Sequence, residues 1–260
     1  MTTALSTIDA AKLAVAERAS TIVASGMRVG LGTGSTAAFL VKCLGERVRA
    51  EGLDIVCVPT SVATAELARE EGIRLATLDE AGWLDLTVDG ADEFDPDLNL
   101  IKGAGGALLR EKVVATASDR MIAIVDASKQ VQALGAFPLP VEVLGFGMDV
   151  TKALLEKVLE TQDVDGRRIE PRRRNGKIFT TDEGNHILDL HLGRIGNARD
   201  LALALNQIPG VVENGLFIGM CDTIILGNVD GTVETILAPR GNSETHRTER
   251  TGGDRPAAAK

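Results

Sequence analysis

Short apolar runs alternate with helical stretches through the first half of the chain, and this alternation limits the fold more than any other feature. The runs at 27–32, 54–61, 73–78, 84–90 and 120–128 are rich in Val, Ile and Leu, and helical segments lie between most of them. Apolar strands separated by helices of ten to fifteen residues indicate βαβ units, whose parallel sheet is covered on both faces. The sequence therefore predicts an α/β fold: an open, mostly parallel, Rossmann-like sheet with helices on both faces.

The pattern changes near residue 135. The stretch GAFPLPVEVLGFG has no helical period, and it is followed by a predicted helix at 149–162, strands joined by Asn-Gly and Glu-Gly turns, and a second helix at about 197–207. This mixture indicates a small α+β module inserted near the end of the larger fold. We therefore expect a large α/β domain from residues 1–134 and 212–240, and a small α+β domain at 135–211.

Charge and cysteine content limit the classes of partner. The chain carries a net charge of −9 at pH 7, which argues against nonspecific nucleic-acid binding and against adhesion to anionic membranes. No apolar run approaches the ~20 residues of a membrane span. Three widely spaced cysteines without a CxxC pair, Cys43, Cys57 and Cys221, suit free thiols in a reducing cytoplasm. Cys57 lies in the apolar run DIVCV and is expected to be buried.

The two ends of the chain differ from the rest. The first twenty residues lack the basic start and compact apolar segment of a secretory signal, and they predict an amphipathic helix capped by Ser6, Thr7 or Asp9. The last twenty, 241–260, contain no Val, Ile, Leu, Met or aromatic residue. They cannot bury enough apolar surface to offset the entropy of ordering, so we expect a disordered tail.

A glycine-rich loop, VGLGTGSTAAFL, joins the first predicted strand to its helix. Glycines let the backbone approach a ligand closely, and the N–H groups at the start of the helix then face an anion. The loop matches neither GxGxxG nor GxxxxGK[ST], which weakens dinucleotide and nucleoside-triphosphate interpretations; the alternative to phosphate binding is a tight turn whose Ser or Thr caps the helix. The candidate phosphate-binding residues are Gly32, Thr33, Gly34, Ser35 and Thr36.

An acidic turn, VDGADEFD, follows the next strand-like run. Asp89 ends that run, where open α/β sheets place their ligands, and Gly90 allows a sharp turn that brings Asp92 back toward the same place. Ordinary turn chemistry explains Asp and Gly here equally well, and a divalent metal site is a third interpretation.

A second glycine-rich stretch, IKGAGGALLREK, begins with a lysine, Lys102. Its glycines, starting at Gly103, precede a predicted helix and leave backbone donors uncovered, and Glu111 lies within that helix. Arg110 and Lys112 flank Glu111, so spacing alone favours a surface carboxylate over a catalytic one.

All three stretches are predicted at the ends of strands of the same parallel sheet, so their loops should share one edge. Together they supply an anion cradle, two or three carboxylates, one lysine and uncovered backbone donors, with no motif for a nucleophilic serine or cysteine. A carboxylate can remove the proton beside a carbonyl, and a lysine with backbone amides can stabilise the resulting enediolate. This set of groups fits proton transfer on a sugar phosphate.

The blocks GLGTGSTA, VDGADEFD, IKGAGGALLREK and IVDASKQVQALGAFPLPVEV, with IPGVVENGLF near the C-terminus, resemble in order and spacing those of ribose-5-phosphate isomerase, type A, over about residues 8–238. The resemblance implies an enzyme that interconverts ribose 5-phosphate and ribulose 5-phosphate through a cis-enediol, in the non-oxidative branch of the pentose phosphate pathway. It also implies no metal or organic cofactor, a cytoplasmic location, and a homodimer or homotetramer.

The resemblance also implies roles for individual residues. Glu111 would be the base that moves the proton, Asp89 would open the sugar ring and Asp92 would position the substrate hydroxyls. Lys102 with the Gly103 region would stabilise the developing charge. The residues implied at the phosphate are Thr33, Ser35 and Thr36 with Lys12 and Lys129. The chain has GAGG where GGGA is common, and PTSVATAE where many members have a serine-rich loop, which leaves substrate contacts near Ser61 unassigned.

Three other functions compete with this one. A metal-dependent isomerase needs ligands, but His186 and His191 alternate along a predicted strand on opposite faces and His246 lies in the tail. A coenzyme A transferase with a nucleophilic glutamate does not account for the glycine loop and the VDGADE block. A sugar-phosphate sensor without catalysis would carry a basic DNA-binding module, which a single N-terminal helix in an acidic chain does not supply.

Overall fold

A computed structural model describes residues 6–239 as two compact units. Unit 1 contains the residues up to Gly90, Arg110–Lys129 and the residues from Gly219 onward, and unit 2 contains Ala91–Leu109 and Gln130–Ile218. The predicted domain boundaries, 1–134 with 212–240 and 135–211, stay a prediction. The predicted disordered tail lies outside the described residues.

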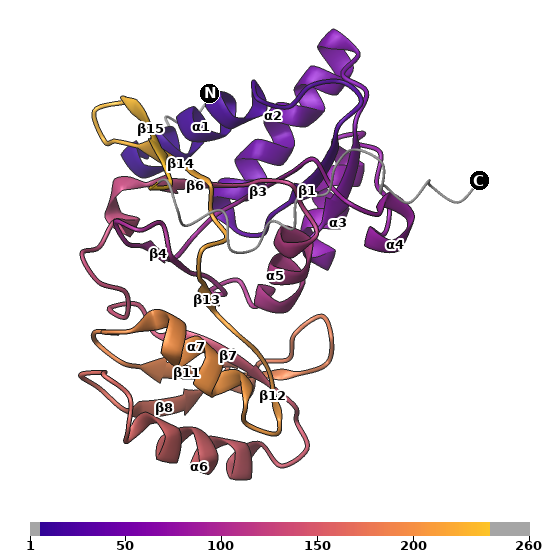
Figure 1. The fold of residues 1–260 in the computed structure, drawn as a ribbon. Helices are drawn as coiled ribbons and strands as arrows, with labels where there is room; N and C mark the ends of the chain where they lie inside the picture. Colours follow the sequence, from indigo (N-terminus) through magenta and orange to yellow (C-terminus); the bar gives the residue numbers. More distant parts are fainter. Residues whose placement is uncertain (1–5, 240–260) are drawn as a thin grey trace. The chain divides into compact units, whose positions relative to one another are not determined.

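Unit 1 is built on a six-stranded sheet with the order β15-β14-β6-β3-β1-β2 (Figure 1). All neighbours are parallel except β15, which runs antiparallel to β14. The strands are β1 (Arg28–Leu31), β2 (Val56–Pro59), β3 (Leu86–Asp89), β6 (Met121–Asp126), β14 (Thr223–Gly227) and β15 (Val233–Leu237). The helices are α1 (Thr7–Ser20), α2 (Ser35–Glu51), α3 (Val62–Glu70), α4 (Leu78–Ala81), α5 (Leu108–Thr116), whose first two residues belong to unit 2, and the 3-10 helix η1 (Ala127–Lys129).

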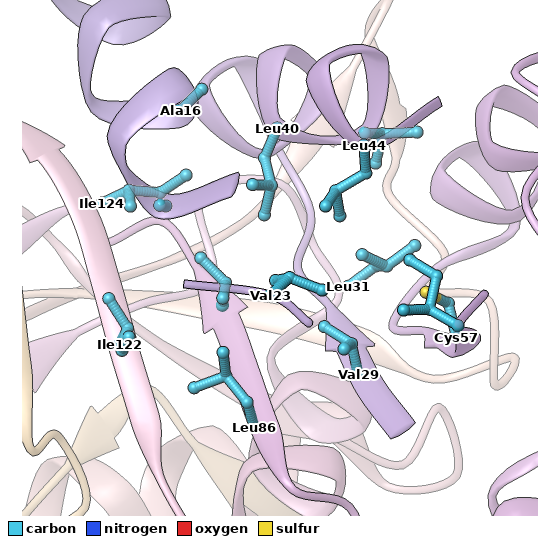
Figure 2. Close-up of a cluster of buried hydrophobic side chains, with 14 of the residues drawn as sticks. Ala16, Val23, Val29, Leu31, Leu40, Leu44, Cys57, Leu86, Ile122 and Ile124 are labelled. Carbon is cyan, nitrogen blue, oxygen red and sulfur yellow. The ribbon is translucent and has the colours of Figure 1, made fainter. Parts of the chain in front are cut away.

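Alternation along the strands directs side chains to two helical layers. Val29 and Leu31 of β1 join a buried cluster with α1 and α2, and Figure 2 shows Leu40 and Leu44 of α2 reaching into it. Gly30 faces the other way, where a Cβ would collide with the side chains of Thr87 and Val114. Since successive strand residues point to opposite faces, α5 covers the second face. The predicted α/β fold with helices on both faces is confirmed.

Local signals set where the helices begin. Ser6 is the N-cap of α1, and its hydroxyl accepts a hydrogen bond from the Asp9 N–H at 3.1 Å, as one of the predicted alternatives. The run 73–78 was expected to be a strand, but only Leu75 pairs, in an isolated parallel bridge with Cys57. Thr77 and Glu80 form a capping box that starts α4 instead, so helix nucleation ends the extended segment there.

Unit 2 combines antiparallel sheets with two helices, as predicted for the small α+β module. A four-stranded sheet has the order β12-β7-β11-β8, and short two- and three-stranded sheets accompany it. The strands are β4 (Glu93–Phe94), β5 (Leu100–Ile101), β7 (Leu139–Val143), β8 (Arg168–Pro171), β9 (Arg173–Arg174), β10 (Lys177–Ile178), β11 (His186–His191), β12 (Val211–Asn214) and β13 (Leu216–Phe217), and the helices are α6 (Met148–Leu159) and α7 (Ala198–Asn206).

The core of unit 2 lies between its four-stranded sheet and its helices. Val141 and Leu188 of the sheet, Leu155 of α6 and Leu205 of α7 are fully buried in one cluster. The predicted Asn-Gly turn joins β9 to β10, with Asn175 and its glycine both at positive φ, as a two-residue hairpin turn of type I′ requires. No helix within residues 6–239 is long and apolar enough to cross a membrane.

Candidate active site

The glycine loop after β1 begins directly against a carboxylate. Gly32 is buried, and a Cβ there would collide with the backbone and side chain of Asp89. Gly34, at φ 112°, is the N-cap of α2, and no side chain caps this helix. The sequence had left Ser35 or Thr36 as the cap; instead both lie inside the first turn. The start of α2 therefore presents backbone N–H groups in the way that anion sites require.

The Asp89 side chain holds this loop in place through hydrogen bonds. Its side chain is fully buried, and its Oδ1 accepts hydrogen bonds from the Thr33 N–H at 3.1 Å and from the Gly90 N–H at 2.7 Å. A single carboxylate oxygen thus holds the loop after β1 to the turn after β3, the strand beside it. The prediction that these two loops share one edge of the parallel sheet is confirmed.

The Thr33 side chain lies in a cluster of hydroxyls. Its Oγ1 lies 2.8 Å from Thr60 Oγ1, donates to Ser61 Oγ at 2.9 Å and lies 3.2 Å from Thr64 Oγ1. Thr64 in turn donates to the Gly32 carbonyl at 3.0 Å. The hydroxyls at 60, 61 and 64 come from PTSVATAE, the segment whose role the sequence had left unassigned. The spacing of hydroxyl residues in this segment was the one sequence feature that could have indicated the cluster.

Two lysines, Lys12 and Lys129, were predicted to lie near the glycine loop. Lys12 Nζ, on α1, donates to Ser35 Oγ at 3.0 Å and lies 3.8 Å from Asp9 Oδ1. A cation therefore adjoins the first turn of α2. Lys129 ends η1, which follows β6, so it lies beyond the carboxyl end of a neighbouring parallel strand.

Glu111 is buried on the sheet-facing side of α5, with 3% of its surface exposed. Just beyond the end of α5, Ser118 Oγ lies 2.6 Å from Thr87 Oγ1 of β3. Glu111 shares a helix face with Val114, three residues on, and the Val114 carbonyl accepts from Thr87 Oγ1 of β3 at 3.5 Å. Beyond the end of α5, the Ala117 carbonyl accepts from the N–H of Leu84, which precedes β3. Because α5 runs opposite to β3, this places Glu111 toward the end of β3 that carries Asp89. Spacing alone had favoured a surface position for Glu111, and the structure shows that interpretation to be wrong.

The remaining acids of the run VDGADEFD, all in unit 2, have separate uses. Asp92 Oδ2 accepts a hydrogen bond from the Ala104 N–H at 2.8 Å. Glu93 is buried, and its carboxylate accepts from two backbone N–H groups, those of residues 135 and 137. Asp95 closes a turn by accepting from the Asn99 N–H at 2.9 Å. Only Asp92 reaches the second glycine-rich stretch.

Lys102 is also buried, at 2% exposure. Its N–H donates to the Gly215 carbonyl at 2.9 Å, and its ammonium lies 5.5 Å from the centre of the Phe217 ring. It follows β5, which pairs antiparallel with β4 and β13 in a three-stranded sheet. The prediction that this stretch follows a strand of the large parallel sheet is therefore wrong. Two-residue strands are too short to be recognised from a hydrophobic pattern.

A residue that the sequence did not single out contacts this second turn. Arg172 donates to the Gly103 carbonyl at 2.6 Å and to the Ala104 carbonyl at 3.2 Å. It is one of several cations in the run RRIEPRRRNGK, so nothing in the sequence distinguished it from its neighbours.

Histidines and carboxylates give no metal cluster in the described part of the chain. Within residues 6–239, no group of three or more His, Cys, Asp or Glu side chains is placed to hold a metal ion. His186 Nδ1 lies 3.0 Å from the Phe179 carbonyl, and His191 Nε2 lies 3.1 Å from Glu170 Oε2.

The fold and these side chains define a class: α/β proteins with a glycine-rich loop at a strand end and with buried carboxylate and lysine side chains. Residues 56–231 match the family model described as ribose 5-phosphate isomerase A (phosphoriboisomerase A). The chain belongs to this family. Its members are aldose–ketose isomerases, and the chain is an enzyme of that class.

Individual relatives agree with the family. A ribose-5-phosphate isomerase A from Ruegeria pomeroyi is 64% identical over 249 residues, which cover 96% of this chain and 95% of the relative. The ribose 5-phosphate isomerase of Plasmodium falciparum has a solved structure with a TM-score of 0.83 and 38% identity, covering 88% of this chain and 99% of that one. A D-ribose-5-phosphate isomerase solved in complex with phospho-erythronic acid has a TM-score of 0.82 and 39% identity, with the same coverage.

Proposed function

We propose that the chain interconverts D-ribose 5-phosphate and D-ribulose 5-phosphate by carboxylate-mediated proton transfer through a cis-enediolate, in the non-oxidative branch of the pentose phosphate pathway. The observation that carries this proposal is that Glu111 on α5 and Asp89 at the end of β3 are both buried carboxylates of unit 1. Burial holds a carboxylate in one place and excludes water from it, as a general base for a carbon acid needs.

The phosphate is proposed to bind at the start of α2. Gly34, Ser35 and Thr36 would supply backbone and hydroxyl donors there, with Lys12 adjoining Ser35 and with Lys129 as a second cation. A helix N-terminus and an ammonium group both favour a doubly charged anion. Gly32 and Thr33 support this loop from beneath, because the Thr33 hydroxyl is surrounded by those of residues 60, 61 and 64.

Asp89 assists ring opening, after which Glu111 takes the proton from C2 and the C1 carbonyl oxygen becomes negatively charged. The hydroxyl proton then passes from O2 to O1, and Glu111 delivers its proton to C1 as the C2–O2 bond becomes the carbonyl of the ketose. In the intermediate, charge develops on the oxygens at C1 and C2, where the Lys102 ammonium and the N–H groups near Gly103 would stabilise it. Asp92 would accept hydrogen bonds from the substrate hydroxyls. All of these steps use groups of the chain itself, so we propose that the reaction needs neither a metal nor an organic cofactor.

Phospho-erythronic acid, the ligand solved with a relative, supports this chemistry. It is a sugar-acid phosphate one carbon shorter than the substrate, and its carboxylate carries negative charge close to where an enediolate would. We propose that it competes with ribose 5-phosphate for this chain. From the family resemblance, we also propose that the protein is cytoplasmic and forms a homodimer or homotetramer.

The test is ribose 5-phosphate turnover in EDTA by the wild type, Glu111→Gln and Glu66→Gln. Glu66 is an exposed residue of α3 and serves as the matched control. The proposal expects conversion by the wild type and the control, unaffected by EDTA, and a loss of about 10²–10⁴-fold in kcat for Glu111→Gln, the typical contribution of a general base. A folded wild type without turnover, or Glu111→Gln with normal turnover, would refute it.

A further inference from the structure

We propose that Arg172, oriented by Asp189, is a positioning residue for the reaction: it fixes the peptide group between Gly103 and Ala104, one residue beyond Lys102. All of these residues belong to unit 2. The inference rests on the proposed role of Lys102 and of the N–H groups near Gly103 in stabilising the enediolate.

The peptide group between Gly103 and Ala104 is held at both of its polar ends. Its carbonyl accepts a hydrogen bond from Arg172 Nη1 at 2.6 Å, and its N–H donates to Asp92 Oδ2 at 2.8 Å. A guanidinium and a carboxylate thus bind opposite edges of one planar peptide group. Hydrogen bonds to charged partners are stronger than neutral ones, so this plane has one favoured orientation.

A glycine turn needs such an external restraint. Gly103 lies at φ 111°, in the region that glycine enters freely and other residues rarely do. A Cβ there would approach Leu108 to 2.9 Å and Pro140 to 3.1 Å, so a stiffer residue cannot replace the glycine. The backbone of this turn is therefore flexible, and the side chains around it must hold it in one geometry.

Arg172 is itself held by a rigid element. Its Nε and Nη2 donate to the two carboxylate oxygens of Asp189 at 3.0 and 2.5 Å, and both side chains are mostly buried, at 14% and 19% exposure. Asp189 lies in β11, which pairs with β7 on one side and β8 on the other. The planar guanidinium can contact a carboxylate with one edge and a carbonyl with its remaining N–H, which the ammonium group of lysine cannot reproduce.

A second contact from the same segment restrains the turn further along. Gly106, at φ 86°, lies so close to the Phe179 ring that a Cβ would collide with it. The guanidinium of Arg174 lies 4.5 Å from the centre of that ring. The segment 168–179 therefore contacts the glycine turn through Phe179 and through Arg172, and Arg172 does so by hydrogen bonds to the backbone.

The experiment compares wild type, Arg172→Gln, Arg172→Lys, Asp189→Asn and the Arg172→Gln/Asp189→Asn pair, with Arg173→Gln as the matched control. Arg173 is the exposed neighbour, and it donates to the Gly176 carbonyl within its own hairpin. The measurements are kcat and KM for ribose 5-phosphate, hydrogen exchange at the Ala104 amide, and the folded fraction at the assay temperature.

We expect Arg172→Gln to lower kcat about 10- to 100-fold, the scale of a small misplacement of catalytic groups, with KM changed much less and the Ala104 amide exchanging faster. Arg172→Lys should not restore kcat. Asp189→Asn should lower kcat less than Arg172→Gln does. The double variant should have the same kcat as Arg172→Gln, because both substitutions act on the hydrogen bond from Arg172 to the Gly103 carbonyl. Arg173→Gln should match the wild type.

Normal kcat in Arg172→Gln, unchanged exchange at Ala104, restoration by lysine, or a loss that only follows the folded fraction would each overturn the inference. If the wild type turns over, Glu111→Gln does not, and Arg172→Gln is normal, this inference fails alone. If the folded wild type shows no turnover, the proposed function fails and the inference fails with it.

Discussion

Thr33 Oγ1 donates a hydrogen bond to Ser61 Oγ at 2.9 Å, and Ser61 is the N-cap of α3. One hydroxyl pair therefore connects the glycine loop after β1 to the first turn of the helix after β2. Ser61 Oγ also accepts from the Thr64 N–H at 3.1 Å and donates to Thr64 Oγ1 at 2.9 Å. The loop proposed to carry the phosphate is thus built into the fold through buried side chains.

Thr33→Val and Ser35→Ala should separate support of the loop from contact with the phosphate. Thr33→Val removes the contacts of the Thr33 hydroxyl with three neighbouring hydroxyls, each of which keeps another partner, and should lower the free energy of unfolding by ~0.5–1.5 kcal/mol. Ser35 is exposed, so its substitution should change that free energy by less than ~0.5 kcal/mol while raising KM for ribose 5-phosphate. Urea unfolding and steady-state kinetics measure the two effects. Thr33→Val with unchanged stability and a raised KM would instead make the Thr33 hydroxyl a direct phosphate ligand.

Gly32→Ala should lower the stability of the folded protein, although it adds only one methyl group. The added methyl group would collide with the backbone and carboxylate of Asp89, and inserting a methyl group into a packed region costs ~1–3 kcal/mol. Gly90→Ala is the control for stability, because the nearest atom to its Cβ is the Ile124 carbonyl oxygen, 4.0 Å away. Thermal unfolding of both variants tests this. Equal melting temperatures would mean that the loop moves away from Asp89 without loss.

The sequence allowed the large sheet and its loops to be predicted because their signals are local. Apolar runs alternate with helical stretches from β1 to β6, and strand ends in a parallel sheet share one edge, so Asp89 could be placed beside the glycine loop. The hairpin turn at Asn175 was equally local, since positive φ at two successive residues selects Asn-Gly.

Other features depend on contacts between residues far apart in the chain. Lys102 follows a two-residue strand whose partners lie at 93–94 and 216–217, and no short-range pattern indicates that pairing. The burial of Glu111 depends on how α5 packs against β3, although Arg110 and Lys112 beside it are typical of a surface. Arg172 contacts Gly103 across 69 residues. Spacing cannot reveal contacts of this kind.

Two of the cysteines, Cys43 and Cys57, should react slowly with thiol reagents in the folded protein. Burial raises the pKa of the Cys57 thiol to about 12, and burial together with Glu17 and Glu46 raises that of Cys43 to about 11. At pH 8 the thiolate, which is the reactive form, is then roughly one part in a thousand or less. A disulfide reagent at pH 8 should label both only after unfolding by denaturant. Rapid labelling of the native protein at both positions would contradict this.

The same two thiols predict the sign of a pH effect. Their folded pKa values exceed the unfolded value of 9.0, so the folded state holds more protons above pH ~9, and their contribution to stability is lost as pH rises from there through the folded values. Cys57→Ala should therefore lose less stability than the wild type between pH ~9 and ~11, whatever its stability at pH 7. Urea unfolding along this pH series measures the difference, and parallel curves for the two proteins would refute the assignment.

Lys12→Gln should weaken substrate binding with little effect on the chemical step. Lys12 Nζ adjoins Ser35 at the start of α2, and a hydrogen bond to a charged group contributes ~1.5–3 kcal/mol, or roughly 10- to 100-fold in KM. Added salt should raise KM less in this variant than in the wild type, because one of the screened cations is gone. The control is Lys42→Gln, because Lys42 is an exposed lysine of α2 beyond its first turn. A fall in kcat at unchanged KM, or the same change in both lysine variants, would remove Lys12 from the proposed phosphate site.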